Sequence, residues 1–157
     1  MDATSFLQVD HDEIKARLHE LTDEAARTSE RMAAFRALRA ALGLHSHVEE
    51  EIFYPAVMKV RSLVAREAVR SALEDHHVLE GLMAEMAERD DDDPQFAARA
   101  TRLRDALEAH IAAEEGTLFA EARIHLTDER LERLGRRMEA LHTALRFRIP
   151  GNPQPTV

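Results

Sequence analysis

Two overlapping His-x-x-x-Glu pairs stand out in the chain, because imidazoles and carboxylates both bind metals and exchange protons. His45 pairs with Glu49, and His47 pairs with Glu51. Residues four apart on a helix lie about 40° apart around its axis and roughly 6 Å along it, so both pairs can converge on one point. A single pair of this kind is most often an exposed ion pair. Taken alone, the two pairs are equivalent.

An internal repeat separates the two pairs. An Asp-His motif and a His-x-x-x-Glu-Glu motif each occur twice, and the second copy follows the first by 65 positions. The repeated residues are Asp10-His11 with Asp75-His76, and His45, Glu49 and Glu50 with His110, Glu114 and Glu115. The positions that correspond to His47 and Glu51 hold Ala112 and Gly116, which carry no ligand atoms. We therefore expect His45 and Glu49 to face the interior, and His47 and Glu51 to face solvent.

Six residues of the repeat would form one cluster if their helices pack together. They are His11, His45, Glu49, His76, His110 and Glu114. A buried carboxylate is costly unless it is paired or binds a cation. The chain has no cysteine, which excludes thiolate ligands and iron–sulfur clusters. Four imidazoles and two carboxylates are more than one ion could use, and they resemble a non-haem di-iron site in which each Glu bridges two metals.

The elements that must position these residues are predicted to be helices. The chain of 157 residues is 45% hydrophobic and has only five glycines and five prolines, which favours an all-α protein. Hydrophobic residues recur at helical spacing over about 5–27, 29–54, 63–89, 94–123 and 127–147. We expect the first four segments to form an up-down antiparallel four-helix bundle. The fifth, C-terminal helix would pack against the bundle or a partner subunit.

Prolines and acidic residues mark the expected helix ends. Pro55 should kink or end the second helix, because proline lacks a backbone donor and clashes with the preceding turn. Asp93-Pro94 is typical of an N-cap followed by a first-turn proline, after a solvated acidic connection over Asp90 to Asp93. We expect one domain over 1–147 and a disordered, proline-rich tail over 148–157.

Charge and targeting features exclude several classes of protein. The formal net charge of -9 repels phosphate backbones, so we expect no nucleic-acid partner. The N-terminus lacks the basic and apolar regions of a signal peptide, and nowhere do 18 apolar residues run together. The expectation is a cytoplasmic protein without a membrane segment.

The full pattern resembles the hemerythrin-like (HHE cation-binding) family over about 6–123. The motifs that carry the resemblance are Asp10-His11, the run from Glu49 to Pro55, and the run from Glu114 to Phe119, together with the four repeated His. The resemblance implies a four-helix bundle with two non-haem irons, oxo- or hydroxo-bridged, held by the six repeated His and Glu residues. Members of the family bind oxygen or respond to oxygen, iron, nitric oxide or peroxide.

The sequence departs from the oxygen-carrying hemerythrins. Glu80 follows His76 by four positions where those proteins have a further His, and the fourth helix has His-x-x-x-Glu where they have His followed by Asp five positions later. Glu80 is either a seventh metal ligand or a salt-bridged or partly exposed Glu, with equal weight. A further carboxylate ligand would stabilise ferric iron and favour oxidative or peroxide chemistry over oxygen carriage.

Several other polar residues have two interpretations. Tyr54, the only tyrosine, is interpreted as a core aromatic with a hydrogen-bonded hydroxyl in preference to a metal ligand. Asp10 and Asp75 could accept hydrogen bonds from ligand His, but adjacent helical residues diverge by about 100°, so exposure is favoured. Surface positions are expected for His19, His47, His77, His125 and His142.

Three functions are compatible with these features. The first is a di-iron protein that acts on oxygen, peroxide or nitric oxide, with catalase-like or oxidase activity as the enzymatic version. The second is a metal-dependent oxygen, iron or redox sensor whose fifth helix transmits the state of the metal, as a monomer or homodimer. The third is a helical interaction protein without metal, which requires the inward His and Glu to be exposed.

Overall fold

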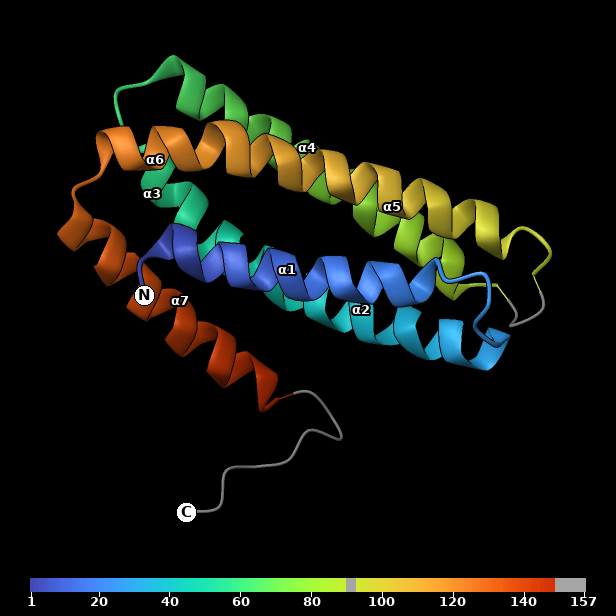
Figure 1. Ribbon diagram of the computed structural model, residues 1–157. Helices are drawn as coiled ribbons and strands as arrows, with labels where there is room; N and C mark the ends of the chain where they lie inside the picture. Colours follow the sequence, from blue (N-terminus) through green and yellow to red (C-terminus); the bar gives the residue numbers. More distant parts are fainter. Residues whose placement is uncertain (90–92, 149–157) are drawn as a thin grey trace, which may run out of the picture.

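Every regular element is a helix within residues 1–89 and 93–148, the ranges that the computed structural model describes (Figure 1). The elements in chain order are α1 (Ala3–Leu21), α2 (Thr28–Val48), the π-helical turn η1 (Glu49–Phe53), α3 (Tyr54–Met58), α4 (Leu63–Ala87), α5 (Phe96–Ala113), the π-helical turn η2 (Glu114–Leu118), α6 (Phe119–His125) and α7 (Asp128–Arg146). The predicted all-α fold class is confirmed.

Two helical hairpins form the bundle. In Figure 1, α1 lies along α2 and α4 lies along α5, and α1 also contacts α5. The α7 helix packs outside the bundle, against α1, α2 and η1. This is the expected four-helix bundle with an additional C-terminal helix. None of the described helices combines the length and apolarity that crossing a membrane requires.

Side chains that bond to nearby backbone set the ends of α1. Asp2 caps its start by accepting from the amides of Thr4 and Ser5. The helix ends at Leu21, earlier than predicted. Thr22 Oγ1 donates to the carbonyl of Leu18, and Asp23 accepts from the amide of Ala25, so this segment forms turns instead of continuing the helix.

The prediction that Pro55 ends the second helix is wrong. The helix passes through η1 and continues as α3 to Met58, with Pro55 in the first turn of α3, where a missing amide is tolerated. The repeat shows that proline is not the cause of the π-turn. The equivalent turn η2 is followed by α6, which has Ala120 at the position of Pro55.

Other boundaries agree with the predictions to within a few residues. The α5 helix begins at Phe96, because Asp93 accepts from the amide of Gln95 and Pro94 stays in the turn before the helix. Thr127 caps α7 through the amide of Arg130. Of the predicted acidic connection over Asp90 to Asp93, residues 90–92 lie outside the described residues, as do residues 149–157 of the predicted disordered tail over 148–157.

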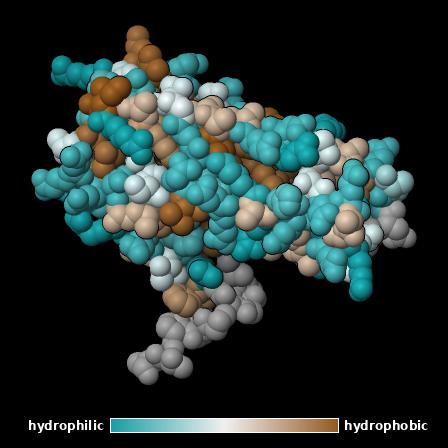
Figure 2. Space-filling view, in the orientation of Figure 1, coloured by the Kyte–Doolittle hydropathy of each residue, from teal (hydrophilic) through white to brown (hydrophobic). Residues whose placement is uncertain are grey.

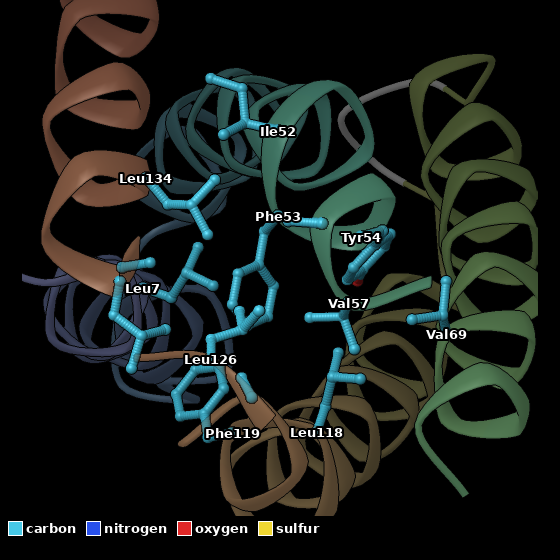
Figure 3. Close-up of a cluster of buried hydrophobic side chains, with 14 of the residues drawn as sticks. Leu7, Ile52, Phe53, Tyr54, Val57, Val69, Leu118, Phe119, Leu126 and Leu134 are labelled. Carbon is cyan, nitrogen blue, oxygen red and sulfur yellow. The ribbon is translucent and has the colours of Figure 1, made fainter. Parts of the chain in front are cut away.

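Two apolar clusters fill the bundle, and a polar layer separates them. On α1, Leu7 belongs to one cluster and Ile14 to the other, with His11 between them. The same order recurs on α4, where His76 lies between Ala72 and Leu79. Figure 3 shows the first cluster, in which Phe53, Tyr54, Val57, Leu118 and Phe119 converge and Leu134 of α7 approaches from the side.

A close backbone contact fixes α7 on the bundle. A Cβ added to Gly135 would lie 2.3 Å from the carbonyl oxygen of Met1 and 2.8 Å from the carbonyl carbon of Asp2. Figure 1 shows the N-terminus beside α7. Glycine therefore permits the helix to approach the start of α1 closely.

Candidate metal centre

The polar layer contains the six residues of the repeat, all buried. Each is exposed by 3% or less: His11, His45, Glu49, His76, His110 and Glu114. The imidazoles come from α1, α2, α4 and α5, and the carboxylates from the first residues of η1 and η2. The interaction protein without metal required exposure of these residues, and their burial contradicts that condition.

Each carboxylate reaches one imidazole from each hairpin. Glu49 contacts His45 and His76, while Glu114 contacts His110 and His11. The distances from His Nε2 to carboxylate oxygen are 3.2 Å for His45, 3.2 Å for His76, 3.5 Å for His110 and 3.3 Å for His11. This symmetric arrangement follows from the repeat, because the two hairpins supply equivalent side chains to one centre.

Several of these buried atoms have no hydrogen-bond partner among the described residues. They are Nε2 of His11, His45 and His110, Oε1 of Glu49, and Oε2 of Glu114. Such atoms are costly to bury unless another group satisfies them. The ligand atoms form two groups whose members lie within 4.8 Å of one another: His11, His45, Glu49 and Glu114, and Glu49, His76 and His110. The residues therefore fit metal ions, and Glu49 belongs to both groups.

The outward nitrogen of each imidazole bonds to a carboxylate. Asp10 and Asp75 accept from the His of their own hairpin, and Glu50 and Glu115 accept from a His of the other hairpin. The Nδ1 to oxygen distances are 3.3 Å for His45 to Asp10, 3.3 Å for His110 to Asp75, 2.7 Å for His76 to Glu50, and 2.9 Å for His11 to Glu115. These bonds leave Nε2 free to face the centre.

One of these four carboxylates corrects the sequence interpretation, and two are not identified by it. The sequence favours exposure of Asp10 and Asp75. The side chain of Asp10 is only 12% exposed, whereas that of Asp75 is 42% exposed, as expected. Each accepts a hydrogen bond from a His on the neighbouring helix. Glu50 and Glu115 were noted only as repeated residues. Their duplication was the available signal, because repetition at the same offset also marks the six buried residues.

Tyr54 joins the two carboxylates. Its hydroxyl donates to Glu114 Oε1 and lies 3.1 Å from Glu49 Oε2 and 3.2 Å from His76 Nε2. In η1 the amide of Tyr54 bonds to the carbonyl of Glu49, so residues five apart share a face and the phenol lies over the carboxylate. Tyr54 is thus a core aromatic with a hydrogen-bonded hydroxyl. Its equivalent Phe119 has no hydroxyl and stacks on His11 at 5.7 Å.

Opposite charges in the layer control protonation. Burial opposes the charged form of His45, but Glu49 and Asp10 more than offset it and raise its pKa to about 10. Burial also opposes ionisation of Glu49, yet His45 and His76 hold its pKa well below the ordinary value. Burial and the charges of Glu49 and Glu114 raise the pKa of Tyr54, which favours the neutral phenol. A metal ion would compete with the protons on these imidazoles.

Glu80 does not join the cluster. Its side chain is exposed, and it belongs to neither group of possible ligand atoms. Of the two interpretations of Glu80, exposure is the one that agrees with the structure, because Leu79 and Met83 occupy the inward face of α4. Glu80 instead lines a hollow of about 140 Å³ together with His76 and Glu50. Its repeat equivalent, Lys15, lies 3.2 Å from Glu115 Oε1 and so supports that carboxylate in the other half.

The other histidines lie away from the centre. His47 is exposed, as is Glu51, which confirms that the second His-x-x-x-Glu pair faces solvent. His19, His77 and His125 are also exposed. His142 is half-buried, contrary to expectation, because its ring packs edge-on against Phe6 at 5.8 Å.

Comparisons with known proteins agree with this architecture. The protein shares its fold with the crystal structure of a hemerythrin HHE cation binding domain-containing protein, the Rv2633c homolog from Mycobacterium kansasii. The TM-score is 0.79 at 23% identity, and the match covers 96% of this chain and 94% of that one.

Two curated relatives were found over nearly the whole chain. Rv2633c of Mycobacterium tuberculosis is 25% identical over 147 residues, covering 93% of this chain and 88% of the relative. A protein of a Nostoc species named DNA nickase is 24% identical over 151 residues, covering 96% of this chain but 42% of the relative. This chain therefore spans less than half the length of the nickase.

The family comparison covers the elements that carry the cluster. Residues 2–122 match the family described as hemerythrin HHE cation binding domain, and this range includes all six buried His and Glu residues and their four carboxylate partners. The chain belongs to the hemerythrin HHE cation binding domain family.

Proposed function

We propose that the protein is a non-haem di-iron protein that binds or reacts with oxygen, peroxide or nitric oxide, with catalase-like or oxidase turnover. The observation that carries the proposal is the set of buried, unsatisfied Nε2 and carboxylate atoms, arranged as two ligand groups that share Glu49. Two neighbouring cations each require a set of ligands, and a carboxylate that belongs to both sets can bind both cations. The unit that performs this function would extend over 1–147.

Each residue of the site has a role in this proposal. The four imidazoles would bind through Nε2. Glu49 belongs to both ligand groups and Glu114 to one of them, so the two carboxylates would neutralise charge of the ions. When bound, the irons supply reversible redox chemistry and open positions for a small ligand. The outer carboxylates orient the imidazoles and increase their basicity, which stabilises the more highly charged state of the metal. Glu80 has no part in this ligand set.

Metal analysis tests the ligand assignment. Protein purified from iron-replete cells should contain about two irons per chain and absorb in the near ultraviolet, as bridged ferric pairs do. His11→Ala and Glu49→Ala should each lose the iron and the absorption. His47→Ala and Glu51→Ala are matched controls, because the same residue types lie exposed on the same stretch. Protein that carries no metal under these conditions would overturn the proposal.

Optical spectra identify the small ligand. Reduced protein is exposed separately to oxygen, peroxide and nitric oxide, and the true ligand should change the iron absorption. Catalase-like turnover predicts oxygen release from hydrogen peroxide in wild-type protein and none in Glu49→Ala. Iron-loaded protein that leaves all three reagents unreacted would contradict this part of the proposal.

Tyr54→Phe separates two roles of the phenol. If the phenolate oxygen coordinates ferric iron, a visible charge-transfer band is present and the variant loses it. If the hydroxyl only donates to Glu114, the visible spectrum of the variant matches that of the wild type. We expect the second result, because the phenol lies within hydrogen-bonding distance of carboxylates from both halves.

One contact supports a sensor as the alternative function. The α7 helix packs against η1, whose first residue is Glu49. A change at that carboxylate can therefore alter the position of α7 on the bundle. Sensing predicts that oxidation of the iron changes partner binding or oligomeric state and that removal of 127–157 abolishes this response. An unchanged response in the shortened protein would exclude this version.

Nucleic acid is not proposed as a partner, although one relative is named DNA nickase. The net charge of -9 opposes binding to phosphate backbones. Fluorescence anisotropy with labelled DNA at 150 mM salt should show no binding.

A further inference from the structure

A cavity of about 690 Å³ lies between α4, α5 and η2 and reaches the proposed metal centre. Its lining includes His110 and Glu114, which are both buried and whose Nε2 and Oε2 atoms have no hydrogen-bond partner. Leu63 and Val64 at the start of α4 also line it and are 81% and 55% exposed. Figure 2 shows hydrophobic atoms at the upper left, the end of the bundle where α4 begins in Figure 1.

The internal repeat shows how the cavity is built. Five positions that line it carry smaller side chains than their equivalents in the first half. The pairs are Ser71 for Phe6, Ala72 for Leu7, Ala113 for Val48, Thr117 for Ile52, and Leu118 for Phe53. The loss of side-chain volume at every one of these positions opens a hollow beside His110, where the first half is filled beside His45.

The two halves also differ in whether another helix packs over them. In the first half, α7 packs over α1 and η1, and Val48 and Ile52 are buried. In the second half, the equivalent Ala113 and Thr117 are exposed. The side chain of Asp10 is 12% exposed, whereas that of Asp75 in the cavity wall is 42% exposed. The hollow is therefore open to solvent on one side and closed by metal-binding residues on the other.

We propose that this cavity binds a neutral, mostly apolar organic molecule beside the metal ligands His110 and Glu114. The inference rests on the proposed function, because it makes the bound molecule a neighbour of the irons. A diatomic molecule or hydrogen peroxide needs no such space, since a water molecule occupies about 30 Å³ in the liquid. Organic ligands of drug-like or smaller size typically occupy cavities of about 300–1,000 Å³ with mainly apolar walls.

The charges of the wall select against anions. Glu67 and Asp75 line the cavity together with Glu114, and Arg70 is the only Lys or Arg among the residues that line it. Arg70 is also within 3.4 Å of Glu67, which reduces its attraction for an anionic ligand. Ser71 and Thr117 supply neutral hydrogen-bonding groups. A molecule with an apolar body and one hydroxyl matches this surface better than a fatty acid does.

Binding of 2-phenylpropan-2-ol tests the proposal. This neutral probe has an aromatic body and one hydroxyl, and its dissociation constant is measured by ligand-observed NMR with protein of known iron content. Ser71→Phe, and the double variant Ala113→Val with Thr117→Ile, install the residues of the first half. Each should weaken binding at least tenfold. Ala84→Phe adds the same ring on an exposed position of α4 outside the lining and should leave binding unchanged.

Two further measurements sharpen the result. Hexanoate should bind at least tenfold more weakly than 1-hexanol, because the wall is acidic. In iron-loaded protein, the proton resonances of the bound probe should broaden, since the cavity wall includes two proposed iron ligands. Equal binding of the anion and the alcohol would overturn the assigned ligand class.

The outcomes separate this inference from the proposed function. Normal iron content with no probe binding, or with binding that Ser71→Phe and the double variant leave unchanged, overturns the cavity proposal alone. If protein purified from iron-replete cells contains no iron and still binds the probe, the di-iron proposal and the placement of the ligand beside a metal are overturned, while the cavity itself is supported. If a second copy of the chain occupies the cavity, light scattering shows an oligomer that Ser71→Phe disrupts, and the small-molecule proposal is wrong.

Discussion

Each of the four buried imidazoles has a defined use for both ring nitrogens. Nδ1 donates to an outer carboxylate, while Nε2 faces the centre. There, among the described residues, the Nε2 atoms of His11, His45 and His110 lie near Glu49 or Glu114 without a well-aligned hydrogen bond. The bond to Nδ1 sets the orientation of the ring, so that Nε2 is the nitrogen that a metal would bind. A lone His-x-x-x-Glu pair lacks this support, which distinguishes His45 from the exposed His47.

Glu50→Gln should weaken metal binding by about 10–100-fold, because the amide cannot act as the anionic acceptor for His76. The affinity is measured by competition with a chelator of known strength. Glu51→Gln is the matched control, since Glu51 is the exposed neighbour of Glu50. Equal affinity in both variants would show that the outer bond to His76 has no effect on the metal.

Metal binding should release protons at neutral pH. The pKa of His45 is about 10 in the folded protein and about 6.5 in the unfolded chain, so the stabilisation from its protonation is fully present below pH 6.5 and is lost as the pH rises to 10. A metal ion displaces that proton. Titration calorimetry of anaerobic ferrous iron at pH 7, in buffers of different ionisation enthalpy, should report at least about one proton released per chain. A heat of iron binding that does not depend on the buffer would contradict the release of protons.

At the scale of elements, a π-helical turn begins at each central carboxylate. The wider turn brings residues five apart onto one face, which places Tyr54 over Glu49 and Phe119 over Glu114. Both turns also direct the following Glu to a His of the other hairpin. The two turns share this arrangement, although only η1 is followed by a proline, Pro55. The π-helical turn is therefore associated with the repeated carboxylates and does not depend on the proline.

The close packing of α7 on the bundle depends on Gly135. Gly135→Ala should destabilise the protein by about 1–3 kcal/mol, because the added methyl overlaps the backbone of Met1 and Asp2. Gly43→Ala is the control: its Cβ meets no atom within 4 Å, and alanine should stabilise that helix by about 1 kcal/mol. Urea unfolding measures both changes. A stabilised Gly135→Ala protein would show that α7 is not held at this contact.

At the scale of the whole molecule, the polar layer divides the interior into two apolar clusters. Two of the four outer bonds, from His76 to Glu50 and from His11 to Glu115, join the hairpins across this layer. The ligand groups also combine side chains from both hairpins. We therefore expect metal binding and docking of the hairpins to be coupled, because the proposed ligands come together only when the bundle is assembled.

Removal of metal should lower the melting temperature by on the order of 10 °C. Ligand at about 1,000 times its dissociation constant stabilises a folded protein by about 4 kcal/mol, and for a chain of this size each kcal/mol corresponds to about 2–4 °C. Thermal unfolding with and without a chelator measures the change. In Glu49→Ala the chelator should have no effect. An equal melting temperature of metal-loaded and metal-free wild-type protein would contradict the coupling.

The sequence by itself determined the helices and the central ligand candidates. Helix periodicity is local, so the spacing of hydrophobic residues predicts the bundle and α7 to within a few residues at most ends. The repeat is also visible in the sequence alone, and it distinguished the buried pair, His45 and Glu49, from the exposed pair, His47 and Glu51. Duplicated hairpins must present equivalent residues to one centre, which is why an offset in sequence predicted a buried cluster in space.

Only the tertiary structure decided which groups surround that cluster. The contacts of Asp10, Glu50 and Tyr54 depend on a neighbouring helix or on a π-turn, and neither follows from α-helical spacing. Glu80 lies one turn from His76, as the spacing predicted, yet packing of Leu79 and Met83 leaves it exposed. The open cavity beside His110 also depends on the tertiary structure, because α7 packs over the first of the two repeated halves and leaves the second half open.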